Sequence, residues 1–186
     1  MMIDADGWLV GGQRVDSPNC DSRPGDEAPS LVVIHAISLP PNQFGGPGVV
    51  QLFTNTLPVE EHPFYAEIAS LRVSAHFFIR RDGEVIQFVS TEQRAWHAGI
   101  SQWQGRERCN DFSLGIELEG CDSQPFEPPQ YSALIELLQG LQQRYPSLQA
   151  IAGHVDIAPG RKTDPGPFFD WHTLHQHFQG VVFPQQ

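Results

Sequence analysis

Three side chains of metal-binding types stand in two widely separated parts of the chain. His35 follows an apolar run, and His154 and Asp164 lie in the constrained stretch "GHVDIAPGRKTDPG". A catalytic zinc ion takes three protein ligands and leaves its fourth position for water, and two imidazoles with a carboxylate suit it. Taken singly, each histidine could instead be a strand-end residue bonded to the backbone, and Asp164 could be a turn former. The spacing is therefore compatible with a metal site without establishing one.

Two further charged residues have the chemistry to act beside such a site. Lys162 is the one lysine of the chain, against ten arginines, and it precedes Asp164 by two positions. An ammonium there could stabilise the oxyanion formed when a carbonyl is attacked, an effect often worth ~3 kcal/mol; the alternative is an exposed charge. Glu117 stands between apolar neighbours and suits a general base acting on zinc-bound water. Glu119 shares its strand face, and a solvated edge strand would explain both carboxylates equally well.

Arginine and aromatic side chains could bind a substrate. Arg72, Arg106 and Arg108 could hold carboxylates by bidentate pairing, which would suit an acidic ligand of an acidic protein. Ordinary surface arginines are the alternative, and the better one for Arg106. Trp96 and His97 in "AWHAG" could form a wall against an apolar or sugar ring, although core packing is the commoner role of such residues.

Strands are expected to position the candidate site residues in the first part of the chain. The β-branched run "LVVIHAISL" (31–39) predicts a strand buried on both faces, and a short helix is expected over 49–57. Two apolar runs around "RRDG" (74–90) predict a hairpin in which Gly83 supplies the positive φ of the turn. Residues 93–111 have no clean period and are expected to form a long loop that lines something. The alternation over 112–120 predicts another strand.

The second half of the chain is predicted to alternate helix, strand and helix. Apolar residues at helical spacing predict a helix over 127–146, flanked by prolines, that covers one face of a sheet. A short strand is expected within 149–159 and a terminal helix over 170–180. Strands interleaved with helices indicate an α/β fold, and the antiparallel hairpin makes its central sheet mixed. We therefore expect a single domain with a mixed β-sheet flanked by helices.

Composition limits the partners. The chain has 186 residues, enough for one domain with a substantial core. A net charge of −11 would repel a phosphate backbone, so nucleic acid is not an expected partner. Three cysteines without a C-x-x-C spacing argue against a disulfide framework. The acidic N-terminus does not resemble a secretory signal and no window suits a membrane span, so a cytoplasmic protein with no membrane partner is expected.

Five stretches taken together resemble one enzyme family. They are "VVIHAISLPPNQFGG", "LRVSAHFFIRRDGEVIQFV", "RAWHAG", "GRERCNDFSLGIELEG" and "GHVDIAPGRKTDPGPFFDW". In this order they resemble the cytoplasmic 1,6-anhydro-N-acetylmuramyl-L-alanine amidases of the AmpD type. That group of zinc amidases also includes T7-type phage lysozymes and peptidoglycan recognition proteins. The resemblance covers nearly the whole chain.

The resemblance implies a mixed sheet packed by helices and one zinc ion bound by His35, His154 and Asp164. It implies that Glu117 and Lys162 are the catalytic residues. The reaction would be hydrolysis of the amide between the lactyl group of anhydromuramic acid and L-alanine of the stem peptide, a step of cell-wall recycling. The expected partner is thus a small muropeptide, and a monomer is expected. The amidase domain would span 31–178, with an irregular segment at 1–30 packed on it and a tail at 179–186.

The resemblance also implies substrate-binding positions at Arg72, Ala95, Trp96 and Arg108. At one position the chain departs from the family, which commonly has His-Asn-Ile-Ser-Leu-Pro where this sequence has "HAISLP". Ala36 has no amide to offer a substrate, and a lost neutral hydrogen bond is typically worth ~1 kcal/mol. Weaker substrate affinity with the chemistry retained is therefore expected.

Two other readings remain open from the sequence. The pair His154 and Asp156, with a distant histidine, could form the two-histidine, one-carboxylate triad of a non-haem iron oxygenase. That reading leaves Glu117 and Lys162 without a role. A non-catalytic binding module for peptidoglycan fragments is the second alternative. The filled ligand positions argue against it, whereas Ala36 keeps it open.

Overall fold

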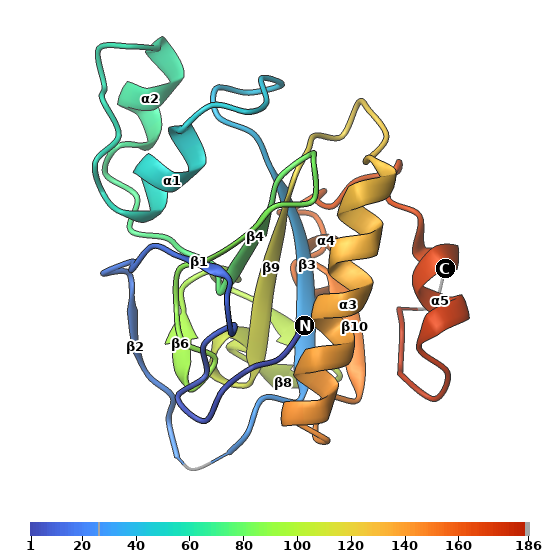
Figure 1. Cartoon of the computed structure of the whole chain (residues 1–186). Coiled ribbons are helices and arrows are strands. Elements are labelled where there is room, and N and C mark those ends of the chain that lie inside the picture. Colours follow the sequence, from blue (N-terminus) through green and yellow to red (C-terminus); the bar gives the residue numbers. More distant parts are fainter. Residues whose placement is uncertain (26, 185–186) are drawn as a thin grey trace.

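A mixed β-sheet forms the centre of the computed structural model, which describes residues 1–25 and 27–184 (Figure 1). Its six strands lie in the order β1-β5-β4-β9-β3-β10. Their bounds are Gln13–Arg14 (β1), Leu31–Ile37 (β3), Phe77–Ile79 (β4), Val85–Gln87 (β5), Ser113–Glu119 (β9) and Ala150–Gly153 (β10). β3, β4, β9 and β10 are mutually parallel, and β5 pairs antiparallel with β4. The predicted mixed sheet is confirmed.

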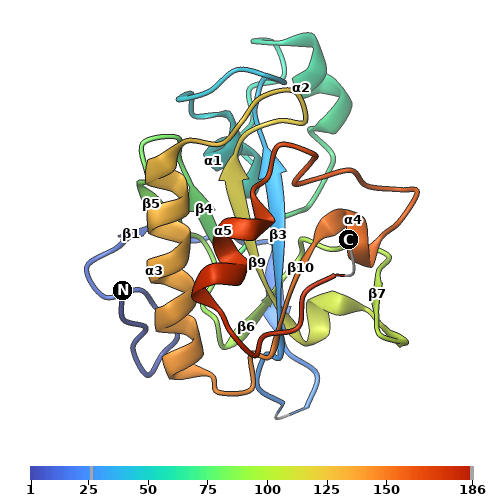
Figure 2. The ribbon, with the colours of Figure 1, turned by 90° about the vertical axis from the view of Figure 1, so that its right-hand side faces the viewer.

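Helices lie on both sides of the sheet (Figures 1 and 2). α3 (Pro128–Arg144) and α5 (Trp171–His177) pack on one face, where Ile34 and Ile116 of the central strands share a core cluster with Leu134 of α3. On the other side, α1 (Gly48–Phe53) contributes Phe53 to a second cluster with Phe78 of β4. α2 (Pro63–Ile68) follows α1, and both helices lie toward the end to which the arrowheads of β3 and β9 point.

The predicted hairpin and the predicted long helix are both present. β4 and β5 pair antiparallel around a turn in which Gly83 has a φ of 90°. A side chain there would also come within 2.9 Å of the Pro129 carbonyl oxygen, so the turn needs glycine for two reasons. α3 begins with two prolines in its first turn, where no helical N–H is needed. The helix expected over 49–57 ends earlier, at Phe53, and α2 was not predicted.

The segment 93–111 was predicted as a long loop, and this prediction was wrong in part. It contains the short elements β6 (Gln93–Ala95), β7 (Gln102–Trp103), β8 (Arg106–Glu107) and the 3-10 helix η1 (Cys109–Asp111). β7 and β8 form a small hairpin, whereas β6 pairs with β2 (Cys20–Ser22) near the N-terminus. Because β6 is defined by its pairing with a strand that is distant in sequence, its own residues show no periodic pattern.

The ends of the chain are tied to the sheet. β1 pairs with β5, and Val182 forms a parallel bridge with Ala150. Residues 185–186 of the expected tail lie outside the described residues. All three cysteines are free. No helix in the described ranges is both long and apolar enough to cross a membrane.

Candidate metal centre and active site

The parallel strands bring three donor side chains to one point at their carboxyl ends. His35 is the third-last residue of β3, and His154 opens α4 (His154–Ile157) directly after β10, which pairs with β3. Asp164 lies in the loop after α4. Nδ1 of His35 is 2.9 Å from Nδ1 of His154, and the two nitrogens are 3.2 and 3.1 Å from Oδ2 of Asp164. The donor atoms of these residues all lie within 4.8 Å of one another.

His35 and Asp164 are in the protonation states that bind metals. Burial lowers the pKa of His35 to about 4, so its imidazole is neutral at pH 7. Burial alone would raise the pKa of Asp164, but its close contacts with His154 and His35 outweigh that effect and hold the pKa well below its usual range. Neutral imidazoles with an ionised carboxylate are the forms that a zinc ion needs. The side chains are therefore ready to accept a cation.

Glu117 stands beside this cluster, and no side-chain hydrogen bond to another described residue holds it. It pairs in register with His35 across β3 and β9, so the two side chains lie on the same face of the sheet. Only 8% of the residue is exposed, and its Oε2 atom is one of two buried side-chain oxygens in the described part of the chain that have no hydrogen-bond partner. Burial and the neighbouring charge of Asp164 raise the pKa of Glu117 well above its ordinary value. A group in this state is poised to exchange a proton.

Glu119 shares that face of β9 but has a structural role. Its Oε1 accepts a hydrogen bond of 2.6 Å from the backbone N–H of Gly45, and its Oε2 accepts one of 3.1 Å from that of Arg81. It thereby ties two loops to the end of β9. The ambiguity between the two glutamates is thus resolved by their hydrogen bonds.

A cavity of about 570 Å³ opens onto the cluster, and Lys162 lines it together with Glu117. Lys162 forms no ion pair with the other described residues. An apolar part of the cavity wall comes from α1, α2 and the segments next to them. Its members are Leu39, Leu52, Phe53, Phe64, Ile68, Leu71 and Val73. Sequence reasoning missed this wall, because its residues come from several separate segments and show no shared period.

The five residues assigned to substrate binding are not gathered in one place. Ala36 lines the cavity. Arg72 is exposed and donates hydrogen bonds to the backbone carbonyls of Ala69 and Leu71, outside the cavity lining.

The other three assigned residues also lie outside the cavity lining. Ala95 is fully buried in the core. Trp96 is half-buried and pairs through its backbone with Ser74. Arg108 is 71% exposed and pairs with Asp111. The described cavity therefore contains one of the five residues.

His97 lies closer to the donor cluster than the sequence indicated. It was considered as a wall for a ring, but its buried Nδ1 lies 2.9 Å from Nε2 of His35. It also lines the cavity. Its position directly after Trp96 in "RAWHAG" was the available signal, yet the contact with His35 depends on tertiary structure.

The iron-oxygenase reading is wrong, because Asp156 does not join the cluster. Its Oδ2 accepts a hydrogen bond of 2.7 Å from the backbone N–H of Gly153 and so closes the first turn of α4. The carboxylate that meets His35 and His154 is that of Asp164.

Comparisons with known proteins agree with this geometry. The family model described as N-acetylmuramoyl-L-alanine amidase matches residues 25–167. The 1,6-anhydro-N-acetylmuramyl-L-alanine amidase AmpD of Escherichia coli is 58% identical, over 91% of this chain and 93% of that protein. Its counterpart in Citrobacter freundii is 54% identical, over 99% and 96%.

Solved structures extend the likeness to three dimensions. The crystal structure of a selenomethionine AmpD derivative has a TM-score of 0.93 at 54% identity and covers 98% of this chain and 100% of that one. The Escherichia coli amidase AmiD has a TM-score of 0.61 at 31% identity, over 84% of this chain and 59% of that one. The chain therefore belongs to the N-acetylmuramoyl-L-alanine amidase family.

Proposed function

We propose that this protein hydrolyses the amide bond between the lactyl group of 1,6-anhydro-N-acetylmuramic acid and L-alanine of the stem peptide, in peptidoglycan recycling. The observation that carries the proposal is the meeting of His35, His154 and Asp164 beside a buried carboxyl group that has a free oxygen. The relatives at 50 to 58% identity named as anhydromuramyl amidases support the substrate class. Action in the cytoplasm and as a monomer belongs to the proposal.

The donor set fits the zinc ion that the family implies. Two imidazole nitrogens and one carboxylate oxygen converge at hydrogen-bonding distances, which makes three protein ligands and leaves a fourth position open. All three donor residues line the cavity, so a substrate bound there would lie next to the ion. When bound, a zinc ion polarises a carbonyl group and lowers the pKa of water to about 7.

Glu117 would move the proton. Its Oε2 makes no hydrogen bond within the described protein, so it is free to accept a proton from the attacking water. The same carboxyl group can then donate this proton to the nitrogen of L-alanine as the amide bond breaks. Its burial keeps bulk water from competing for the proton.

Lys162 would stabilise charge. It lines the same cavity as Glu117 and Asp164, and its ammonium is not held by an ion pair to a described residue. It can therefore turn to the oxygen of the attacked carbonyl, where negative charge develops in the transition state. The apolar part of the cavity wall would contact the methyl groups and ring carbons of the substrate.

The test is the release of free peptide from an anhydromuramyl tripeptide, followed by mass spectrometry. The solved AmiD complex holds the substrate anhydro-N-acetylmuramic acid-L-Ala-D-γ-Glu-L-Lys, which makes this compound the natural choice. We expect release by the zinc-loaded protein and none after treatment with a chelator. Tight binding of the tripeptide without release, with zinc present, would show the binding module instead.

A further inference from the structure

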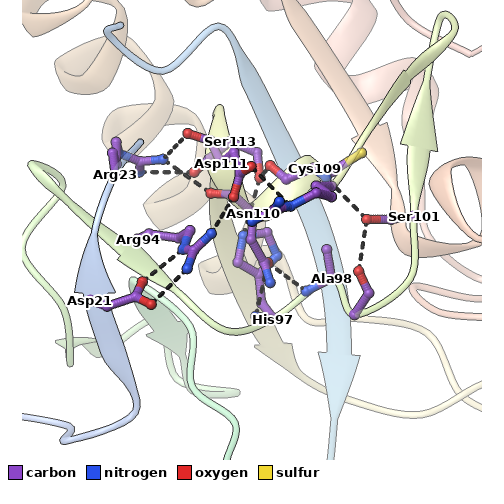
Figure 3. Close-up of polar contacts among 12 residues, drawn as sticks. Asp21, Arg23, Arg94, His97, Ala98, Ser101, Cys109, Asn110, Asp111 and Ser113 are labelled. Carbon is purple, nitrogen blue, oxygen red and sulfur yellow. Dashed lines mark hydrogen bonds and ion pairs between the residues drawn. The ribbon is translucent and has the colours of Figure 1, made fainter. Parts of the chain in front are cut away.

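His97 makes polar contacts that the proposed reaction does not use. The residue is 8% exposed and belongs to the set of polar contacts shown in Figure 3. Its Nδ1 is 2.9 Å from Nε2 of His35, and its Nε2 is 3.2 Å from Oγ of Ser113. Its ring packs on the bare backbone of Gly115, where an added Cβ would come within 2.5 Å of the His97 Cγ. The ring is therefore confined between His35 and Ser113.

The Cys109 end of this chain of hydrogen bonds determines which group is the donor in each bond. Oγ of Ser113 is 2.5 Å from the backbone oxygen of Cys109, and a carbonyl oxygen can only accept, so the hydroxyl proton lies on this bond. Ser113 Oγ can then only accept from Nε2–H of His97. Because a neutral imidazole carries one proton, Nδ1 of His97 is an acceptor, and the donor to it is Nε2–H of His35. Nδ1 of His35 is left with its lone pair.

That lone pair points at the other two donor atoms. Nδ1 of His35 is the atom that lies 2.9 Å from Nδ1 of His154 and 3.2 Å from Oδ2 of Asp164. The opposite tautomer would place a proton at this point and block a metal ion there. The carbonyl oxygen of Cys109 thus determines, through Ser113 and His97, that Nδ1 of His35 keeps the lone pair that a metal ion would use.

Ala98, the residue after His97, fixes the tautomer of His154 in the same way. The backbone oxygen of Ala98 lies 3.1 Å from Nε2 of His154, so this nitrogen carries the proton and Nδ1 keeps its lone pair. Asn110 holds the segment in place, because its Oδ1 accepts hydrogen bonds from the backbone N–H groups of His97 and Ala98 (Figure 3). One short segment thereby orients both imidazoles.

From these contacts we propose that His97 is a positioning residue that fixes His35 in the tautomer able to bind zinc. The inference rests on the proposed metal site and adds a residue to it that does not touch the metal. Partners of this kind fix the ring orientation and the basicity of a ligand histidine, and their loss typically weakens metal binding ~10–100-fold.

The experiment compares two substitutions of His97. His97→Leu removes the acceptor for Nε2–H of His35, whereas His97→Asn can place a carbonyl oxygen where Nδ1 of His97 stands. The zinc dissociation constant is measured by competition with a chromophoric chelator. The tautomer of His35 in the metal-free protein is read from its imidazole nitrogen-15 shifts. We expect ~10–100-fold weaker zinc binding for His97→Leu, with part of His35 protonated at Nδ1, and affinity close to wild type for His97→Asn.

The control is His76→Asn, which removes a buried histidine whose ring packs on that of His97, with ring centroids 5.9 Å apart, and which therefore tests the effect of lost packing alone. His76 makes polar contacts with Gly115, Gln93 and Arg23 and none with the three donor residues, so its loss should leave the zinc dissociation constant unchanged. If His97→Leu does not fold, Ser113→Ala gives the decision, because it removes the group that directs the His97 proton. A protonated Nδ1 of His35 together with weaker zinc binding would then support the proposal.

Three results would overturn the proposal. The first is unchanged zinc affinity and an unchanged His35 tautomer in folded His97→Leu, or in Ser113→Ala where the former does not fold. The second is an equal loss of affinity in His97→Leu and His97→Asn, which would indicate a packing role. The third is a wild-type chain that binds no zinc, which removes the metal site itself. Because the first two are read with zinc bound to the wild type, they leave the proposed amidase function intact.

Discussion

At the scale of single residues, hydrogen-bond partners decide what each carboxylate on β9 can do. Glu117 and Glu119 lie on one face of the same strand, and both are almost completely buried. Glu119 is satisfied by two backbone N–H groups, whereas one oxygen of Glu117 has no partner. A buried polar atom without a partner costs free energy, so its presence beside the three possible metal ligands points to use in the reaction.

Replacing the two glutamates should separate these roles. Glu117→Gln keeps the shape of the side chain but cannot take up a proton, so we expect kcat to fall by ~10²–10⁴-fold with zinc retained. Glu119→Gln should keep most of the activity and lose ~1–3 kcal/mol of unfolding free energy, because a charged acceptor of two N–H groups is lost. Peptide release and urea unfolding of both variants provide the measurements. Equal losses of kcat in the two variants would contradict the assignment.

Ala36 is the second test at this scale. It lines the cavity near the end of β3 and offers no hydrogen-bonding group to a substrate. One restored neutral hydrogen bond is worth ~1 kcal/mol, so Ala36→Asn should raise kcat/KM for the anhydromuramyl tripeptide about fivefold. Ala36→Ser is the control, because its hydroxyl group extends less far from the backbone than the amide of asparagine. An unchanged kcat/KM in Ala36→Asn would refute a role in substrate affinity.

At the scale of elements, buried side chains join strands that are far apart in sequence. His76 lies directly before β4, and its Nδ1 accepts a hydrogen bond from the N–H of Gly115 in β9. Its Nε2 lies 3.0 Å from the backbone oxygen of Gln93 in β6 and donates to it. Burial, reinforced by the charge of Arg23, lowers the pKa of His76 to about 3. Both nitrogens are in use only while the ring is neutral.

The protonation of His76 should therefore make the fold sensitive to acid. Its pKa of about 3 in the folded protein is below the unfolded value of ~6.5, so the unfolded chain binds the proton first as the pH falls. The stabilisation is complete above pH ~6.5 and is lost progressively toward pH 3. At pH 5 the loss amounts to ~2 kcal/mol, from 1.36 kcal/mol per pH unit over about 1.5 units.

Chemical unfolding of the metal-free protein at pH 7.5 and 5.0 tests this expectation. His76→Asn keeps an acceptor for Gly115 but does not titrate in this range. The difference in unfolding free energy between wild type and variant should shrink by ~2 kcal/mol on acidification. A difference that stays constant between the two pH values would rule out His76 as the source.

At the scale of the whole molecule, the candidate metal centre joins distant parts of one chain. His35 belongs to β3, and His154 and Asp164 follow β10 near the C-terminal end. A metal ion bound there would hold the loop after α4 against the central sheet. Because the three donors meet only in the folded chain, binding of a metal ion would stabilise the folded state.

Zinc removal should consequently lower the melting temperature. A free zinc concentration of 100 times Kd stabilises the folded state by ~2.7 kcal/mol. For a domain of this size that corresponds to a fall of ~5–10 °C when a chelator removes the ion. Thermal unfolding with and without chelator measures the change. Lys162→Ala should keep the full shift, Asp164→Ala should lose most of it, and a full shift in Asp164→Ala would contradict the ligand assignment.

The sequence predicted the elements whose signals are local. The β-branched run before His35, the hairpin around Gly83 and the amphipathic helix over 127–146 each have a periodic pattern or a turn residue, and all three are present. It also named the three donors, because their residue types and the rigid loop around Asp164 are visible without a fold. The family resemblance then reduced the alternatives.

Tertiary structure alone decided which of these side chains meet. Glu117 and Glu119 are indistinguishable in an alternating strand, and only the loops that approach β9 separate a free oxygen from a satisfied one. The contact between His35 and His97 and the pairing of β2 with β6 join segments far apart along the chain. Local periodicity records how a segment faces its immediate surroundings, whereas such contacts depend on how the packed sheet brings distant segments together.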